Sequence, residues 1–83
     1  FKTAWMAACP DFQDTHNYGF DEPGQANLSL ATNWVAQQFN CLAYTIEMPF
    51  KDNADWPDAQ VGWNGARSKK LGASVLQPLL VVV

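Results

Sequence analysis

One carboxylate, Glu47, stands at the end of an apolar segment that Pro49 terminates. Side chains over residues 41–48 alternate in size, and this alternation predicts a β-strand. The bulky face suits a core, whereas small side chains on the other face lead to Glu47 and leave room for a substrate or a metal. A proline closes a strand because it has no N–H to donate. Glu47 is therefore either a catalytic carboxylate or an edge-strand side chain pointing into water, and the pattern alone does not establish catalysis.

Metal-ligating residues are scarce. The chain has one histidine, His16, in a polar loop without a second ligand at helical or hairpin spacing. A catalytic zinc site needs three protein ligands, so we predict no metal ligand among these residues. His16 is expected to face solvent or to form a local hydrogen bond. The alternative is a supporting role at the rim of a cleft.

The basic side chains and the loop after Glu47 also have both a structural and a functional interpretation. Arg67, Lys69 and Lys70 fall in the first turns of the last predicted helix, where we expect a solvated face. An acidic substrate or an interface is the alternative. Asp52 and Asn53 are expected to hydrogen-bond the backbone of their own loop. The four tryptophans are expected to pack, although those in this loop could lie at a cleft.

Composition limits the class of protein. A chain of 83 residues makes one domain at most, and its core is thin. Only 16% of its residues are charged, against about 25% in ordinary soluble domains. We therefore expect a partner, or the rest of a longer chain, to cover part of its surface. A net charge of −3 argues against nucleic acid as a partner, and the apolar tail from Val75 is too short to span a membrane.

The predicted elements must position these side chains. We expect a helix over residues 1–9, a loop, a helix over residues 27–39, the strand over residues 41–48, and a last helix from Asn64. Asn27 would cap the second helix, and Pro78 would kink the last one near Ser74. This order predicts an α/β fold whose other strands lie outside the chain, since one strand makes no sheet.

The sequence also predicts which cysteine and apolar side chains are buried. We expect Cys9 and Cys41 to be two buried thiols rather than a disulfide. Two sets of apolar side chains are expected to face a core. In the second helix the stripe is Leu28, Ala31, Val35 and Phe39, and in the last helix the set is Leu71, Val75, Leu76, Leu79 and Leu80.

Four collinear runs carry a resemblance to a known family. They are PDFQ from Pro10, PGQANLSLATNW from Pro23, YTIEMPFKDN from Tyr44 and GWNGARS from Gly62. These runs resemble the C-terminal part of bacterial zinc carboxypeptidases, in the cytosolic branch of the carboxypeptidase A superfamily. The resemblance implies that residues 1–83 are the C-terminal part of one catalytic domain, in which helices and one strand join a carboxypeptidase-like α/β sheet. The N-terminal part of that domain would then be missing here.

The same resemblance implies the chemistry. Glu47 corresponds to the general base and acid of these enzymes, and Tyr18 to a mobile loop tyrosine that closes over the substrate; a packed aromatic ring that holds the loop is the alternative for Tyr18. Zinc would be bound in the full-length parent by ligands upstream of these residues. The implied substrate is the C-terminus of a peptide or protein, in the cytoplasm. The chain alone is expected to be inactive, and a non-catalytic interaction module is the second hypothesis.

Overall fold

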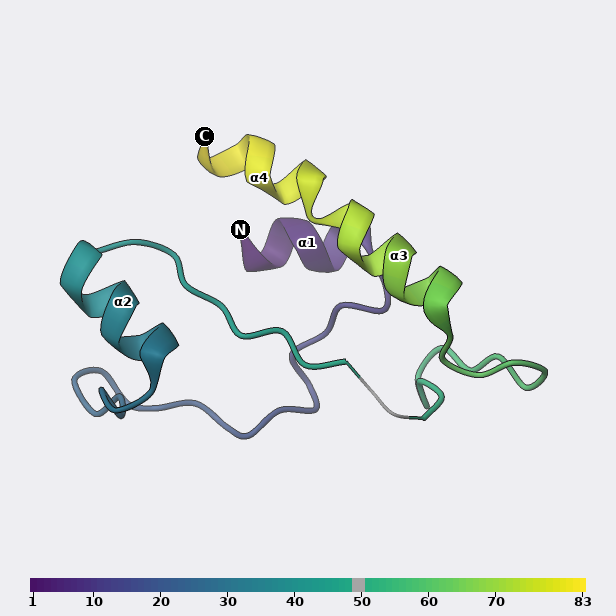
Figure 1. Cartoon of the computed structure of the whole chain (residues 1–83), viewed down its shortest axis with the longest axis horizontal. Helices are drawn as coiled ribbons and strands as arrows, with labels where there is room; N and C mark the ends of the chain where they lie inside the picture. Colours follow the sequence, from purple (N-terminus) through teal and green to yellow (C-terminus); the bar gives the residue numbers. More distant parts are fainter. Residues whose placement is uncertain (49–50) are drawn as a thin grey trace. The chain divides into compact units, whose positions relative to one another are not determined.

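The computed structural model describes residues 1–48 and 51–83, which divide into two compact units (Figure 1). Unit 1 contains residues 1–16 and 48–83, and unit 2 contains residues 17–47. Helices α1 (Lys2–Ala8), α3 (Gly65–Ser74) and α4 (Leu76–Val82) belong to unit 1, and helix α2 (Ala31–Phe39) belongs to unit 2. The described residues form these helices and no strand.

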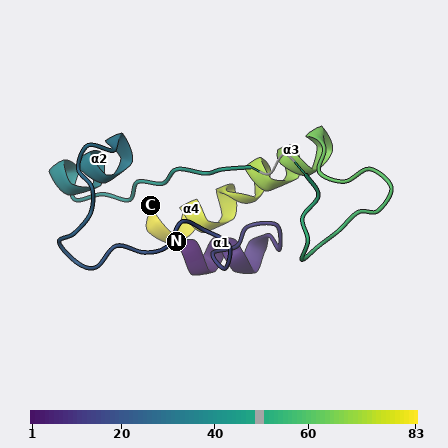
Figure 2. The ribbon, with the colours of Figure 1, turned by 90° about the horizontal axis from the view of Figure 1, so that it is seen from below.

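The core of unit 1 lies where α1 packs beside α3 and α4 (Figure 2). Trp5 is 4% exposed, Leu71 is 5% exposed, and Pro78 is fully buried. The Trp5 ring stacks on Phe12 at a centroid distance of 4.1 Å, and its Nε1 donates to the Ser74 hydroxyl at 2.7 Å. A tryptophan thus supplies apolar area and a satisfied polar group together. The helix predicted over residues 1–9 is confirmed.

The last predicted helix begins and breaks as expected. The Asn64 side chain caps α3 by accepting from the Arg67 amide at 3.0 Å. Pro78 cannot donate to the Ser74 carbonyl four residues earlier, and α3 ends at Ser74. Leu71 and Val75 face the core as predicted.

The other apolar residues predicted to face the core from the last helix do not face it. Leu76 is 66% exposed, Leu79 38% and Leu80 75%, so the prediction that they face inward is wrong for the described structure. The reason is geometric, because α1 is a short helix and covers only one side of α4.

Unit 2 has no buried residue. Helix α2 begins at Ala31 rather than at the predicted Asn27, because the Asn27 side chain accepts from the Ser29 amide and hydroxyl and forms a local turn instead. Asn40, at φ 46° and ψ 50°, caps the helix after Phe39, where the predicted helix also ends. The predicted stripe is largely uncovered, and Phe39 at its end is 69% exposed.

The strand predicted over residues 41–48 is not confirmed. These residues are described, but they run without strand pairing (Figure 1). A strand is defined by backbone pairing with a second strand, and the described part of the chain offers none. The predicted α/β class is therefore not confirmed either, and Pro49, which was expected to close the strand, lies outside the described residues.

The two cysteines are free thiols. Cys9 is buried in the core of unit 1, as predicted. Cys41 is exposed, so the prediction of a second buried thiol is wrong. Cys41 follows α2 directly, in a unit that contains no core to bury it.

Candidate functional site

Unit 2 brings together the two residues that the sequence singled out for chemistry. The Tyr18 hydroxyl donates to Oε2 of Glu47 at 2.8 Å, across 29 positions of the chain. Tyr18 is 93% exposed, so the alternative of a packed ring is wrong for the described structure. The turn after Tyr18 uses Gly19 at φ 99°, whose amide donates to the Asn17 side chain.

The contact changes the acidity of the tyrosine. The hydrogen bond to Glu47, and then the negative charge of that carboxylate, raise the pKa of Tyr18 above its ordinary value of 10.0. Tyr18 is therefore a neutral hydroxyl at physiological pH, able to donate one hydrogen bond.

The small-residue face of residues 41–47 is not open along its length. The Thr45 hydroxyl lies 2.7 Å from the hydroxyl of Thr32 in the first turn of α2, and Cys41 Sγ lies 3.9 Å from the Val35 carbonyl. The predicted approach for a substrate beside Thr45 is thus occupied by α2. The bulky side chains of the same segment are the uncovered ones, with Leu42 56% exposed.

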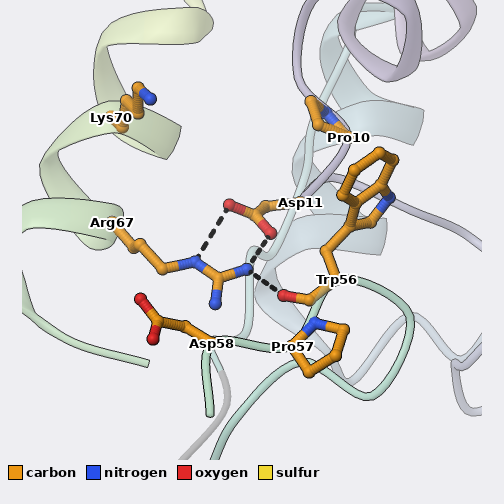
Figure 3. Close-up of a pocket in the computed structure, with 7 residues that line it drawn as sticks. All are labelled: Pro10, Asp11, Trp56, Pro57, Asp58, Arg67 and Lys70. Atoms are coloured by element: carbon orange, nitrogen blue, oxygen red, sulfur yellow. Dashed lines mark hydrogen bonds and ion pairs between the residues drawn. The ribbon is translucent and has the colours of Figure 1, made fainter. Parts of the chain in front are cut away.

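In unit 1 the polar residues gather around Arg67 (Figure 3). Its guanidinium bonds Asp11 at 2.6 Å, Asp52 at 3.1 Å and the Trp56 carbonyl at 2.7 Å, and it lies 5.0 Å from the centroid of the Trp63 ring. The Arg67 and Asp11 side chains are only 17% and 12% exposed. The prediction of a solvated face is therefore wrong for Arg67, while Lys69 and Lys70 are exposed.

This arrangement is a structural anchor for the loop after Glu47. Asp52 accepts from the Asp58 amide at 2.8 Å and Asn53 from the Asp55 amide at 3.0 Å, which confirms the predicted loop hydrogen bonds. A hollow of about 260 Å³ opens beside it. The residues lining the hollow are Pro10, Asp11, Trp56, Pro57, Asp58, Arg67 and Lys70 (Figure 3). Most of the Arg67 donors are already paired with Asp11, Asp52 and the Trp56 carbonyl.

Burial and pairing act in opposite directions on Asp11. Burial by itself raises the pKa of Asp11. The hydrogen bonds from Arg67 and Asn53, with the charges of Arg67 and Lys70, outweigh it and lower the pKa below its ordinary value of 3.8. Asp11 is thus held as a carboxylate, and the hydrogen bond that Arg67 donates to Asp11 raises the pKa of Arg67 in turn.

No group of three potential metal ligands occurs among the described residues. His16 donates its backbone N–H to the Gln13 side chain at 2.7 Å, and its exposed ring lies 3.4 Å from Asp55. The exposed ring confirms the prediction that the His16 side chain faces solvent. Within the part of the chain that is described, no helix is long and apolar enough to cross a membrane.

The chain is similar to segments of several longer proteins. No family model matches the chain. A crystal structure of a metallo-carboxypeptidase from Burkholderia cenocepacia matches 96% of the chain at 50% identity, with a TM-score of 0.82. The chain is similar to a segment of a metallo-carboxypeptidase. A putative carboxypeptidase from Burkholderia mallei matches 95% of the chain at 46% identity, with a TM-score of 0.81.

A third protein is similar in sequence. An uncharacterized protein, ZMO1242, from Zymomonas mobilis is 50% identical over 74 residues, which make up 89% of the chain. The chain spans about a fifth of the length of these relatives, between 20% and 21% in each case. The chain therefore corresponds to a carboxypeptidase-like segment of longer proteins.

Proposed function

We propose that this chain is the C-terminal part of the catalytic domain of a zinc-dependent carboxypeptidase, of the cytosolic carboxypeptidase branch. The longer protein, called the full-length protein below, would remove the C-terminal residue of peptides or proteins in the cytoplasm. The single observation that carries the proposal is the match of 96% of the chain, at 50% identity, to a metallo-carboxypeptidase. The acidic net charge of −3 supports a peptide rather than a nucleic acid as the substrate.

Glu47 would be the proton shuttle. As general base it takes a proton from the attacking water, and as general acid it then gives a proton to the leaving amine. Its carboxylate is exposed and accepts a hydrogen bond from the hydroxyl of Tyr18, so it can be reached from solvent. Zinc would polarise the scissile carbonyl and the water, but the described residues offer no ligand set, so its ligands would lie in the missing N-terminal part.

The missing part would also complete the fold. Residues 41–48 would form a strand that pairs with strands outside these 83 residues, giving the α/β sheet. Uncovered apolar side chains support this, among them Leu42 at 56% and Ile46 at 38% exposure on one side of the segment. Without that part, the chain alone would be inactive.

The test of this proposal is hydrolysis of a peptide with a free C-terminus by the full-length protein. The expected result is release of the terminal amino acid, with no release from the same peptide carrying a C-terminal amide. The amide matters because a carboxypeptidase recognises the free carboxylate. Equal cleavage of both peptides, or of neither, would argue instead for an endopeptidase or for a non-catalytic module.

Tyr18 would bind the substrate. Removing its hydroxyl in a Tyr18→Phe variant is expected to raise KM about tenfold, the effect of one lost hydrogen bond to a charged group, while kcat changes less. Tyr44→Phe is the matched control, since it removes a hydroxyl from the other tyrosine of unit 2. Steady-state kinetics check this, and a KM within twofold of wild type would remove Tyr18 from substrate binding.

A further inference from the structure

Two threonine hydroxyls join helix α2 to the segment that carries Glu47. Oγ1 of Thr32, in the first turn of α2, lies 2.7 Å from Oγ1 of Thr45, and either hydroxyl can be the donor. Thr45 stands two residues before Glu47. In an extended segment, side chains two positions apart point to the same face. The contact with α2 is therefore made on the face that bears the carboxylate.

Unit 2 gives this segment no buried core to pack against. None of residues 17–47 is buried, and the bulky side chains of the segment are uncovered, with Leu42 56% and Ile46 38% exposed. Polar contacts tie three positions of the segment to the rest of unit 2, namely Cys41 to the Val35 carbonyl, Thr45 to Thr32, and Glu47 to Tyr18.

These three contacts differ in what they can fix. The contact of Cys41 Sγ at 3.9 Å is long and weak, and Tyr18 belongs to a loop. Thr32 belongs to a helix, whose backbone is set by its own hydrogen bonds. The 2.7 Å contact between the two hydroxyls is thus the short contact through which helix α2 fixes the position of residues 45–47.

We propose that Thr32 and Thr45 are positioning residues for Glu47, in that their hydroxyl pair sets the place of the carboxylate relative to α2. The inference rests on the proposed role of Glu47 in proton transfer. A catalytic carboxylate must stand within about 0.5 Å of its productive position. A displacement of about 1 Å from a change remote from the chemistry can cost about 10²-fold in rate.

The test is a double-mutant cycle in the full-length protein, with Thr32→Val, Thr45→Val and both together. Valine keeps the shape of threonine and removes the hydroxyl. Each single variant is expected to lower kcat about tenfold with KM nearly unchanged, and the double variant to be no worse than either single one, because both remove the same contact. Thr45→Ser keeps the hydroxyl and is expected to restore kcat. Thr15→Val, an exposed threonine of unit 1, is the matched control.

Two further measurements separate this inference from the proposed function. In the protein with methyl-labelled threonine, a nuclear Overhauser effect is expected between the Thr32 and Thr45 methyl groups, and its absence overturns the inference whatever the activity. A Glu47→Gln variant with normal activity would overturn the proposed role of Glu47 in proton transfer, and this inference with it. Loss of activity in Glu47→Gln together with additive or negligible effects of the valine variants would overturn the inference alone.

Discussion

Replacing Glu47 by glutamine in the full-length protein is expected to lower kcat by about 10²–10⁴-fold, the typical contribution of a positioned general base. Glutamine keeps the size of the side chain and can still accept from the Tyr18 hydroxyl, but it cannot take a proton at neutral pH. KM is expected to move little, because the residue acts on the transition state more than on binding.

The matched control for this variant is Glu22→Gln. Glu22 is the other glutamate of the chain and, like Glu47, is exposed in unit 2. Its replacement is expected to leave kcat unchanged. Steady-state hydrolysis of a peptide with a free C-terminus measures both variants, and activity of Glu47→Gln within about threefold of wild type would leave Glu47 as a solvent-facing side chain.

Removing the guanidinium of Arg67 is expected to have the largest effect on structure. An Arg67→Met variant leaves Asp11 and Asp52 without their cation in a site where the Asp11 side chain is 12% exposed. Unpaired carboxylates of low exposure destabilise the folded state. The loop over residues 51–63 should open more often, and its amide hydrogens should exchange at least about tenfold faster.

Hydrogen exchange followed by mass spectrometry measures this effect on peptides from that loop. Lys69→Met is the control, since it removes a cation from an exposed position of the same helix. Arg67→Lys should give an intermediate rate, because lysine keeps the charge but cannot bridge two carboxylates with a planar fork. Exchange as slow in Arg67→Met as in Lys69→Met would show that the network does not hold the loop.

Acidification should act on the same network. The folded pKa of Asp11 is below its ordinary value of 3.8, so its ionised form stabilises the folded state above that value. The stabilisation is lost as pH falls through the lowered pKa of the folded state. The difference in loop protection between wild type and Asp11→Asn should therefore be full near pH 7 and vanish in strong acid. A difference that does not depend on pH would contradict the assignment to Asp11.

Local signals in the sequence predicted the parts of the fold that depend on neighbouring residues. Asn64 caps α3 and Pro78 breaks the last helix because each acts within one helical turn. The start of α2 was missed, since Asn27 can cap a helix or close a short turn and the turn won. The strand over residues 41–48 was not confirmed, because pairing depends on a second strand that no local signal supplies.

The residues of the candidate site were likewise predicted only in part. The sequence singled out Glu47 and Tyr18, and the structure joins them by one hydrogen bond. Thr32 and the paired state of Arg67 were missed. Arg67 meets Asp11 across 56 positions and Thr32 meets Thr45 across 13, and no spacing rule brings such residues together. The charge of Arg67 was visible, but its carboxylate partners were not.

Zinc content of wild-type and Glu47→Gln full-length protein, measured beside their peptide hydrolysis, tests the central claim most directly. The account predicts equal zinc in the two proteins and a kcat about 10²–10⁴-fold lower in Glu47→Gln, because Glu47 is proposed to move protons and the metal ligands are proposed to lie outside this chain. Wild-type protein without zinc, or loss of zinc together with activity in Glu47→Gln, would contradict it, and the second result would make Glu47 a ligand.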